Sequence, residues 1–376
     1  MNAERVKEYI TAHEAEVYSL LRELCAIPAP SHFERARAEY CRRWLEDAGA
    51  EGVYIDGADN VIFPYMCDGK GSVSVLAAHL DTVFPDREPM PYYDDGERIH
   101  SPGVADDTAS AVVLMLTARY FAEQAPECKN GIMFVLNSCE EGLGDLKGTR
   151  YLFAEQGERI GRFITFDSKL NFACDSCVGS HRYEVKITTE GGHSWGNFGR
   201  KNAIAVLSEL IGRIYALDLP KKEGTRTTYN VGTVSGGTSV NTIAQSASML
   251  CEYRSNDVEC LAYMRSRFEE LFESVEGDGV KAEVRKVGDR PCGNADAERM
   301  AELKRTVVPI IEGIIGERVN FCSGSTDCNI PLSLGIPALC VGVNTHGGIH
   351  TREEWVDKRS ILTGLEISMA LAHALA

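Results

Sequence analysis

The chain has 376 residues, 44% of them apolar and 25% charged, as in ordinary soluble globular proteins. Its net charge of −16 arises from 39 basic and 55 acidic residues without a basic cluster, which disfavours nucleic acid and anionic membranes as partners. The length favours two domains. The thirteen cysteines are scattered and odd in number, the N-terminus lacks a signal-peptide pattern, and no apolar stretch could span a bilayer. We therefore expect a cytoplasmic protein.

Two helices are predicted in residues 1–50. The second, residues 34–48, has apolar side chains at helical spacing and is followed by Gly49, which is a common stop. The preceding loop, residues 27–31, offers Ser31 as a candidate N-cap.

Four apolar runs predict buried strands, and each is followed by acidic or histidine side chains. Residues 75–82, 131–137, 162–166 and 337–343 lead to His79 with Asp81, to Glu140-Glu141, to Asp167 and to His350. Ligand sites in open α/β sheets lie beyond the carboxyl ends of the strands. The runs therefore predict one shared cleft.

Residues 108–122 predict a buried helix, because their centre is apolar all round. An apolar strand, this helix and a second apolar strand form the βαβ pattern of a sheet covered on both faces. We expect an α/β domain with a mixed, largely parallel sheet, built from residues 1–178 and 291–376.

The pattern changes near residue 179. Residues 181–188 alternate as a half-exposed strand, and the elements up to residue 286 follow the order β-α-β-β-α-β. This order is typical of a ferredoxin-like α+β sandwich. Residues 179–290 are therefore predicted to form an inserted second domain.

Taken singly, the polar motifs have structural explanations. A lone His79 is most simply a hydrogen-bonded loop residue, and Asp106-Asp107 before a helix is better explained as an N-cap and a first-turn acid. The adjacent Glu140 and Glu141 repel each other after a buried strand, and a cation would relieve this repulsion. The Cys174-x-x-Cys177 motif lacks a second pair at zinc-ribbon spacing and is weak support for a metal or redox site.

Taken together, the motifs form a set of imidazole and carboxylate side chains, the ligands of hydrolytic zinc sites. Two histidines and three carboxylates exceed the needs of one tetrahedral ion and suit two metals that share a bridging carboxylate. His346 competes with His350, and Gly347-Gly348 argue against a helical pair, so at most one is expected to bind metal. The whole set is His79, Asp106, Glu140, Glu141, Asp167 and His350, with Asp81 beside His79.

The order of these motifs resembles the co-catalytic zinc family of aminoacylase, peptidase T, carnosinase-like dipeptidases, glutamate carboxypeptidase and succinyl-diaminopimelate desuccinylase. The resemblance covers almost the whole chain. It rests on His79-Leu-Asp-Thr, Gly103-Val-Ala-Asp106-Asp107, Glu140-Glu141-Gly142, Phe166-Asp167, Gly192-His193-Ser194, Gly236-Gly237-Thr238-x-x-Asn241 and His350-Thr-Arg-Glu-Glu-Trp.

The resemblance implies a role for each residue. Asp106 would bridge two divalent metals, which we expect to be Zn, with Co or Mn as alternatives. His79 and Asp167 would complete one site, and Glu141 and His350 the other. Asp81 would orient His79. Glu140 would be the general base that passes a proton from water to the leaving amine. The Asp106–Asp107 peptide would be cis, and Thr108 departs from the Lys that many members carry after this pair.

The resemblance also implies a lid that forms a homodimer. His193 would donate to the oxyanion in the partner's active site. Asn241 and Arg254 would contact the substrate, although Arg254 could equally be a solvated charge at a strand edge. Gly324 and Ser325 would line the site of the substrate's carboxyl end.

The leading hypothesis is a dinuclear metal hydrolase that cleaves an amide bond in a small peptide. An N-acyl amino acid deacylase on the same site is the alternative. A non-catalytic metal-binding protein is a second class, which the presence of Glu140 disfavours because a scaffold needs no base. A related zinc aminopeptidase without a dimerising lid is the third, which the His193 loop disfavours.

Overall fold

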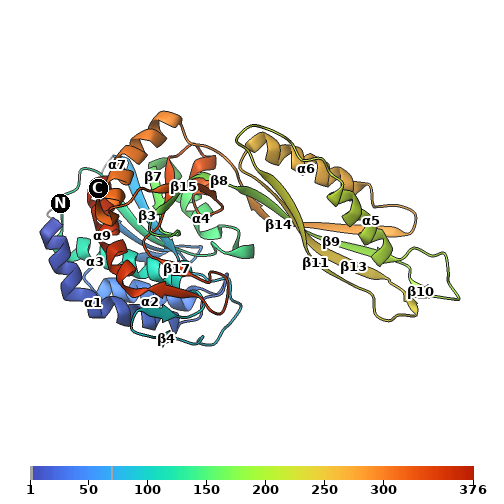
Figure 1. Cartoon of the computed structure of the whole chain (residues 1–376), viewed down its shortest axis with the longest axis horizontal. Coiled ribbons are helices and arrows are strands. Elements are labelled where there is room, and N and C mark those ends of the chain that lie inside the picture. Colours follow the sequence, from blue (N-terminus) through green and yellow to red (C-terminus); the bar gives the residue numbers. More distant parts are fainter. Residues whose placement is uncertain (1–2, 69–70) are drawn as a thin grey trace. The chain divides into compact units, whose positions relative to one another are not determined.

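The computed structural model describes residues 3–68 and 71–376, and the chain divides into two compact units. Unit 1 is formed by the chain up to Cys177 and from Asn294 onward, and unit 2 is the inserted segment Val178–Gly293. Each unit is a sheet with helices packed on it (Figure 1). No helix in the described part of the chain is long and apolar enough to cross a membrane.

Unit 1 is built on a mixed sheet of eight strands in the order β1-β2-β6-β3-β7-β16-β8-β15. The central strands β6, β3, β7 and β16 run parallel, β8 pairs antiparallel with β16, and β15 is parallel to β8. This confirms the predicted mixed, largely parallel sheet. The strands are β1 (Tyr54–Ile55), β2 (Val61–Tyr65), β3 (Val73–His79), β6 (Ile132–Asn137), β7 (Ile160–Thr165), β8 (Phe172–Cys177), β15 (Asn320–Gly324) and β16 (Ala338–Val341).

Helices cover both faces of this sheet. Ile164 of β7 belongs to the core shared with α1, α3 and α9, whereas the neighbouring Phe163 points to the other face and lies 5.7 Å from Phe153 of α4. Alternation along a strand sends successive side chains to opposite faces, so both faces are buried. The helices of unit 1 are α1 (Ala3–Cys25), α2 (Arg35–Asp47), α3 (Ala109–Gln124), α4 (Lys147–Gln156), α7 (Ala297–Ile315), α8 (Asn329–Ser333) and α9 (Lys358–Leu375).

A second, small sheet brings two loops together. Its order is β17-β18-β5-β4, with β17 (His346–Gly347), β18 (Trp355–Asp357), β5 (Arg98–His100) and β4 (Tyr93–Asp94). The turn between β17 and β18 carries His350, and β5 leads into a short π-helix, Val104–Thr108, that carries Asp106. Pairing of β5 with β18 therefore places these two candidate ligands side by side.

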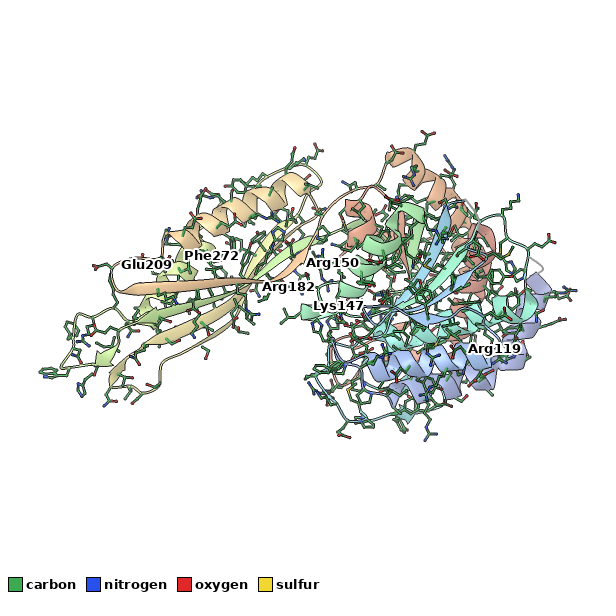
Figure 2. All side chains as sticks on the ribbon, turned by 180° about the vertical axis from the view of Figure 1, so that it is seen from behind. Arg119, Lys147, Arg150, Arg182, Glu209 and Phe272 are labelled. Atoms are coloured by element: carbon green, nitrogen blue, oxygen red, sulfur yellow. The ribbon has the colours of Figure 1, made fainter. Side chains whose placement is uncertain are left out.

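Unit 2 is a four-stranded antiparallel sheet in the order β11-β13-β9-β14, with two helices packed on one face. Phe272 of α6 lies in this core (Figure 2). The predicted β-α-β-β-α-β order is present, because these elements bury alternate strand residues under two amphipathic helices. They are β9 (Gly179–Thr189), α5 (Ala203–Tyr215), β11 (Thr227–Gly236), β13 (Ser246–Ser255), α6 (Val258–Glu273) and β14 (Val280–Arg290), and the short strands β10 (Gly192–His193) and β12 (Thr242–Ile243) pair separately.

One local prediction is wrong. Ser31 does not cap α2, which begins at Arg35 after Glu34. The Ser31 hydroxyl instead donates a hydrogen bond of 2.7 Å to the Asp81 carboxylate. A stronger, charged acceptor from a distant strand therefore takes the hydroxyl that local sequence would assign to the helix.

Candidate active site

His79 is the last residue of β3 and is almost completely buried. Its Nδ1 lies 2.9 Å from the carbonyl oxygen of Asp81, and its Nε2 lies 3.0 Å from Oδ1 of Asp106. A carbonyl only accepts, so Nδ1 carries a proton. Nε2 is therefore the atom that can offer a lone pair to a metal on the side of Asp106.

The Asp81 carboxylate organises the segment that follows β6. It accepts hydrogen bonds from the backbone N–H groups of Glu140 (2.8 Å) and Glu141 (2.9 Å), in addition to the one from the Ser31 hydroxyl. Its Oδ1 lies 3.4 Å from Nδ1 of His79, farther than the Asp81 carbonyl. Asp81 therefore positions Glu140 and Glu141 more directly than it orients the His79 ring.

Asp106 lies between two histidines. Its Oδ1 faces His79, and its Oδ2 lies 3.1 Å from Nε2 of His350. Neither Asp106 nor Asp107 caps α3, because the helix begins at Ala109 and Thr108 occupies the N-cap position. The Asp106–Asp107 peptide is cis, as the resemblance implies. The two oxygens of one carboxylate thus point to different imidazoles.

The remaining predicted ligands converge on the same place. One ligand atom each from His79, Glu140 and Asp167 lies within 4.8 Å of the others, and the same holds for His79, Asp106 and Glu141. Glu141 Oε1 lies 3.3 Å from Nε2 of His350. Ligands at about 2.0–2.2 Å from a zinc ion lie roughly 3–4 Å apart, so these spacings suit metal binding.

The ionisation of the cluster also fits bound cations. Burial, and then the charge of Asp106, raises the pKa of Glu141 to about 8 and that of Asp167 well above its usual range. Burial opposes ionisation of Asp106, but hydrogen bonds with His350 and His79 hold its pKa below the usual range. Glu141 Oε1 is buried, and apart from its ion-pair contact with His350 it has no hydrogen-bond partner in the described part of the chain. Carboxylates packed so closely need protons or cations, and the donor set matches divalent metals.

Glu354 is a buried carboxylate that sequence reasoning missed. It accepts hydrogen bonds from the backbone N–H groups of Gly103 (2.9 Å), Ala105 (2.8 Å) and Asp106 (3.0 Å). It stands four residues after His350, so one short segment contributes His350 and also holds the loop of Asp106. The sequence signal was present in the His350-Thr-Arg-Glu-Glu-Trp motif, but only the fold shows which glutamate is buried.

Replacing Glu354 by Gln is expected to weaken metal binding about 10–100-fold, as removal of outer hydrogen bonds does in other metal sites. A glutamine offers one acceptor oxygen and turns an amide N–H₂ toward the three backbone donors. Competition with a chromophoric chelator would measure the affinity. Glu353→Gln at the exposed neighbouring position is the control, and equal affinities of the two variants would contradict the assignment.

Gly324 is the last residue of β15, and Ser325 follows it in unit 1. The same segment reaches Asp327, a buried carboxylate that accepts from Asn137 Nδ2 (2.6 Å) and from the Thr149 hydroxyl. Asn137 ends β6, the strand that leads to Glu140. The loop is therefore fixed to the strand that carries the candidate base.

The three predicted lid residues lie in unit 2 at two places. His193 pairs with Thr242 between β10 and β12, and the backbone N–H of Ser194 donates to the carbonyl of Asn241 (3.0 Å). Arg254 lies near the other end of β13 and forms hydrogen bonds of 2.7 and 3.0 Å with Glu252. The structure thus brings His193 and Asn241 together but leaves Arg254 apart from them.

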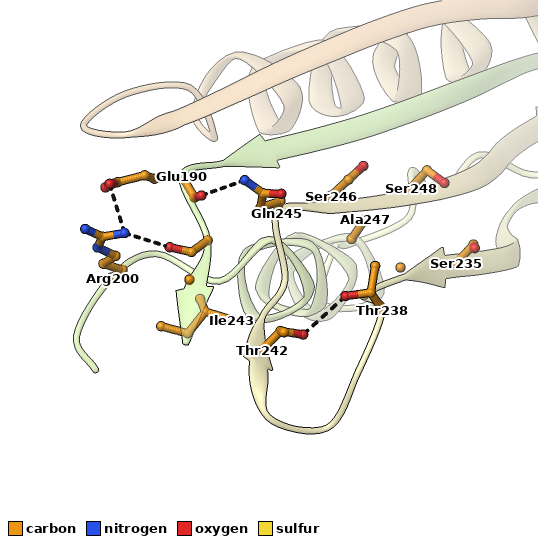
Figure 3. A pocket seen from close by; sticks show the side chains of 14 residues that line it. Glu190, Arg200, Ser235, Thr238, Thr242, Ile243, Gln245, Ser246, Ala247 and Ser248 are labelled. Carbon is orange, nitrogen blue, oxygen red and sulfur yellow. Dashed lines mark hydrogen bonds and ion pairs between the residues drawn. The ribbon is translucent and has the colours of Figure 1, made fainter. Parts of the chain in front are cut away.

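A pocket of about 620 Å³ with both polar and apolar walls lies in unit 2 beside β10 and β12 (Figure 3). Its walls include the ion pair of Glu190 and Arg200 (2.9 Å) and the hydroxyls of Thr238 and Thr242, 3.3 Å apart. Gln245 closes one side by donating to the Glu190 carbonyl. None of the candidate metal ligands of unit 1 lines this pocket.

Two further sequence candidates are resolved by the fold. Unlike His350, His346 forms no ion pair with Asp106 or Glu141 among the described residues, and its Nδ1 lies 2.6 Å from Oδ1 of Asn344. Cys174 lies nearest not to Cys177 but to Cys322 on the neighbouring strand, with 2.8 Å between the sulfur atoms. The thirteen cysteines are all free thiols.

Known proteins match this chain along nearly its whole length. The chain is 24% identical over 354 residues to a putative succinyl-diaminopimelate desuccinylase of Mycobacterium tuberculosis, covering 93% of this chain and 95% of the relative. An aminopeptidase structure from Bacillus cereus superposes with a TM-score of 0.72 at 22% identity, covering 96% of this chain and 98% of that one. A dinuclear metal-binding peptidase from Bacillus subtilis superposes with a TM-score of 0.65 at 16% identity, covering 97% and 100%.

The family model described as peptidase family M20/M25/M40 matches residues 75–374. This match spans His79, the acidic cluster, unit 2 and His350. The matching family and the His, Asp and Glu cluster together support two bound metal ions. The chain therefore belongs to the peptidase family M20/M25/M40 and is a metal-dependent hydrolase of amide bonds.

Proposed function

We propose that the protein hydrolyses an amide bond in a small peptide at a centre of two metal ions. The main support is the position of Asp106. Its Oδ1 lies 3.0 Å from Nε2 of His79, and its Oδ2 lies 3.1 Å from Nε2 of His350. A bridging carboxylate offers one oxygen to each of two metals. His79 and Asp167 would hold one ion, and Glu141 and His350 the other. Zinc suits this imidazole and carboxylate set, and cobalt or manganese could replace it.

Two bound dications would polarise the scissile carbonyl and lower the pKa of a water molecule. We assign the proton transfer to Glu140. A carboxylate oxygen of Glu140 lies within 4.8 Å of the ligand atoms of His79 and Asp167, and its backbone N–H is held by Asp81. It takes a proton from the attacking water and delivers it to the leaving nitrogen. Glu34 supports the same turn by accepting from the backbone N–H of Cys139.

Deacylation of an N-acyl amino acid is the alternative on the same site. Its support is the named activity of the Mycobacterium relative, a putative desuccinylase. Both reactions break an amide bond with the same base and ligands. They differ in the groups on either side of the bond, so only substrate selectivity separates them.

We also propose that unit 2 acts as a lid and dimerisation domain, with residues 179–290 as its range and residues 1–178 and 291–376 as the catalytic domain. Asn241 lies before β13 and Arg254 near its end, so roughly 27 Å of strand separates them at about 3.4 Å per residue. One small substrate cannot touch both within one chain. This supports a homodimer in which one subunit contributes Arg254 and its partner contributes His193 and Asn241. The thirteen free thiols support a reducing compartment such as the cytoplasm.

Removal of metal is expected to abolish turnover, because the water and carbonyl would lose their activating charge. Purified protein would be dialysed against a chelator and assayed on dipeptides, tripeptides and N-acyl amino acids. Addition of Zn, Co or Mn should restore activity, each to its own level. Turnover that survives chelation, with metal absent by mass spectrometry, would overturn the proposed function.

A further inference from the structure

A cavity of about 260 Å³ adjoins the proposed metal centre within unit 1. Asp106 and Asp167 form one wall, so a group bound there would lie next to the reacting bond. Its volume is below the roughly 300–1,000 Å³ of sites for drug-sized ligands, which suits one side chain or a short acyl chain. The lining residues are Ala105, Asp106, Asp167, Ser168, Lys169, Phe172, His346 and Ile349.

Lys169 is the cationic group of this cavity. Burial, and then the charge of Lys169, lowers the pKa of His346 to about 4, so the imidazole is neutral at pH 7. The Lys169 ammonium forms no hydrogen bond or ion pair with any residue in the described ranges 3–68 and 71–376.

The backbone of Lys169 is fixed, although its side chain is exposed. Its carbonyl accepts from Phe172 N (2.8 Å), and the next residue, Leu170, donates to Asn344 O (2.8 Å). Gly342 approaches so closely that a Cβ there would lie 1.7 Å from the Lys169 oxygen, so this contact requires glycine. The Lys169 side chain therefore extends from a fixed backbone position in the lining of the cavity.

The other walls suit a short carbon chain. Phe172 and Ile349 contribute apolar surface to the same lining as Asp106, Asp167 and Lys169. The four carboxylates of the centre carry a formal charge of −4, which two divalent cations would neutralise, so the occupied centre would not repel an anionic substrate. A ligand with methylene groups and a terminal carboxylate matches a lining that combines apolar side chains with one ammonium.

We propose that Lys169 binds a carboxylate of the substrate group held in this cavity, so that the enzyme prefers an acidic side chain or a dicarboxylic acyl group there. This inference rests on the proposed amide hydrolysis at the adjacent centre. Lys169 contributes to selectivity among substrates and takes no part in bond cleavage.

The kinetic test uses matched substrates, glutamyl against glutaminyl peptides and succinyl against butyryl amino acids. The acidic member should have the higher kcat/KM by about 10–100-fold, as a charged hydrogen bond provides. Lys169→Met should remove this preference and leave the neutral member unchanged, and Lys169→Arg should restore it. Lys129→Met, which removes an exposed charge before β6, is the matched control. Equal losses on both members, or none, would overturn the role of Lys169.

A binding measurement separates this inference from the proposed function. Succinate and glutarate would be compared with butyrate and pentanoate by calorimetry on metal-loaded protein. Each pair has one carboxylate in common that can reach the metals, so the second carboxylate reports on Lys169. The diacids should bind about 10–100-fold more tightly to the wild type only. Equal affinities in the wild type would refute the carboxylate site even if peptides are cleaved, whereas selective binding without any turnover would refute the hydrolase alone.

Discussion

Replacing Glu140 by Gln is expected to lower kcat by about 10³-fold or more while the metal content stays unchanged. General acid–base groups contribute about 10²–10⁴-fold, and here one carboxylate serves both proton transfers. Glutamine preserves the size of the side chain and the backbone hydrogen bond to Asp81, but it cannot take a proton. The measurements are kcat on the best substrate of the panel and the metal-to-protein ratio by mass spectrometry.

Glu141→Gln is the matched control for this prediction. The two glutamates are adjacent, and both backbone N–H groups donate to Asp81, but Glu141 Oε1 lies 3.3 Å from Nε2 of His350. The Glu141 variant should lose metal, and added metal should partly restore its turnover. If Glu140→Gln also lost metal in proportion to its activity, Glu140 would be a ligand and the assignment of the base would be wrong.

Replacing Arg37 by Met is expected to reduce the free energy of unfolding by about 3–5 kcal/mol, because unsatisfied buried acceptors cost about 1–3 kcal/mol each. Arg37 is 2% exposed and donates to the carbonyls of Leu24 (3.0 Å), Ile27 (2.6 Å) and Leu80 (2.8 Å). Methionine fills similar space but removes the donor of the Ile27 and Leu80 oxygens, whereas the Leu24 oxygen keeps the backbone N–H of Ile27 (3.0 Å). The midpoint of urea unfolding, followed by circular dichroism, would report the loss.

Arg35→Met tests whether burial is the cause. Arg35 lies two residues earlier in α2 and is largely exposed, with surface ion pairs to Glu39 and Asp59. Such pairs contribute about 0–1 kcal/mol, so this variant should unfold near the wild-type midpoint. Equal shifts of both midpoints would show that the hydrogen bonds of Arg37 contribute little.

Arg37 also bears on the one departure from the family pattern. Its Nη1 contacts the hydroxyl of Thr108, 3.3 Å away, and Thr108 donates to the carbonyl of Gly103 (2.6 Å). Leu80, whose carbonyl Arg37 binds, stands between His79 and Asp81. Thr108 therefore links a buried cation to the turn that carries Asp106, at the position where the family resemblance implies a lysine.

Much of the fold followed from local patterns. The continuous apolar stretches of β3, β6, β7 and β16 predict a sheet buried on both faces, and the alternating residues 181–188 predict a half-exposed strand. The ends of these elements are less well defined by pattern, since α2 and α3 start one residue later than predicted. Ser31 shows why local signals fail: a capping preference of about 1 kcal/mol gives way to a charged acceptor from another strand.

The sequence by itself determined which residues could form the centre. His79, Asp106, Glu140, Glu141, Asp167 and His350 are recognisable because each follows a strand or opens a helix, and chain order supplies the family resemblance. Only the tertiary structure decided how they are held. Glu354 lies 248 residues from Asp106, Lys169 is linked through Leu170 to Asn344, and Arg37 lies 43 residues from Leu80. Hydrogen bonds and a close glycine contact across such separations produce no periodic pattern in the sequence, because they depend on strand pairing and burial rather than on neighbouring residues.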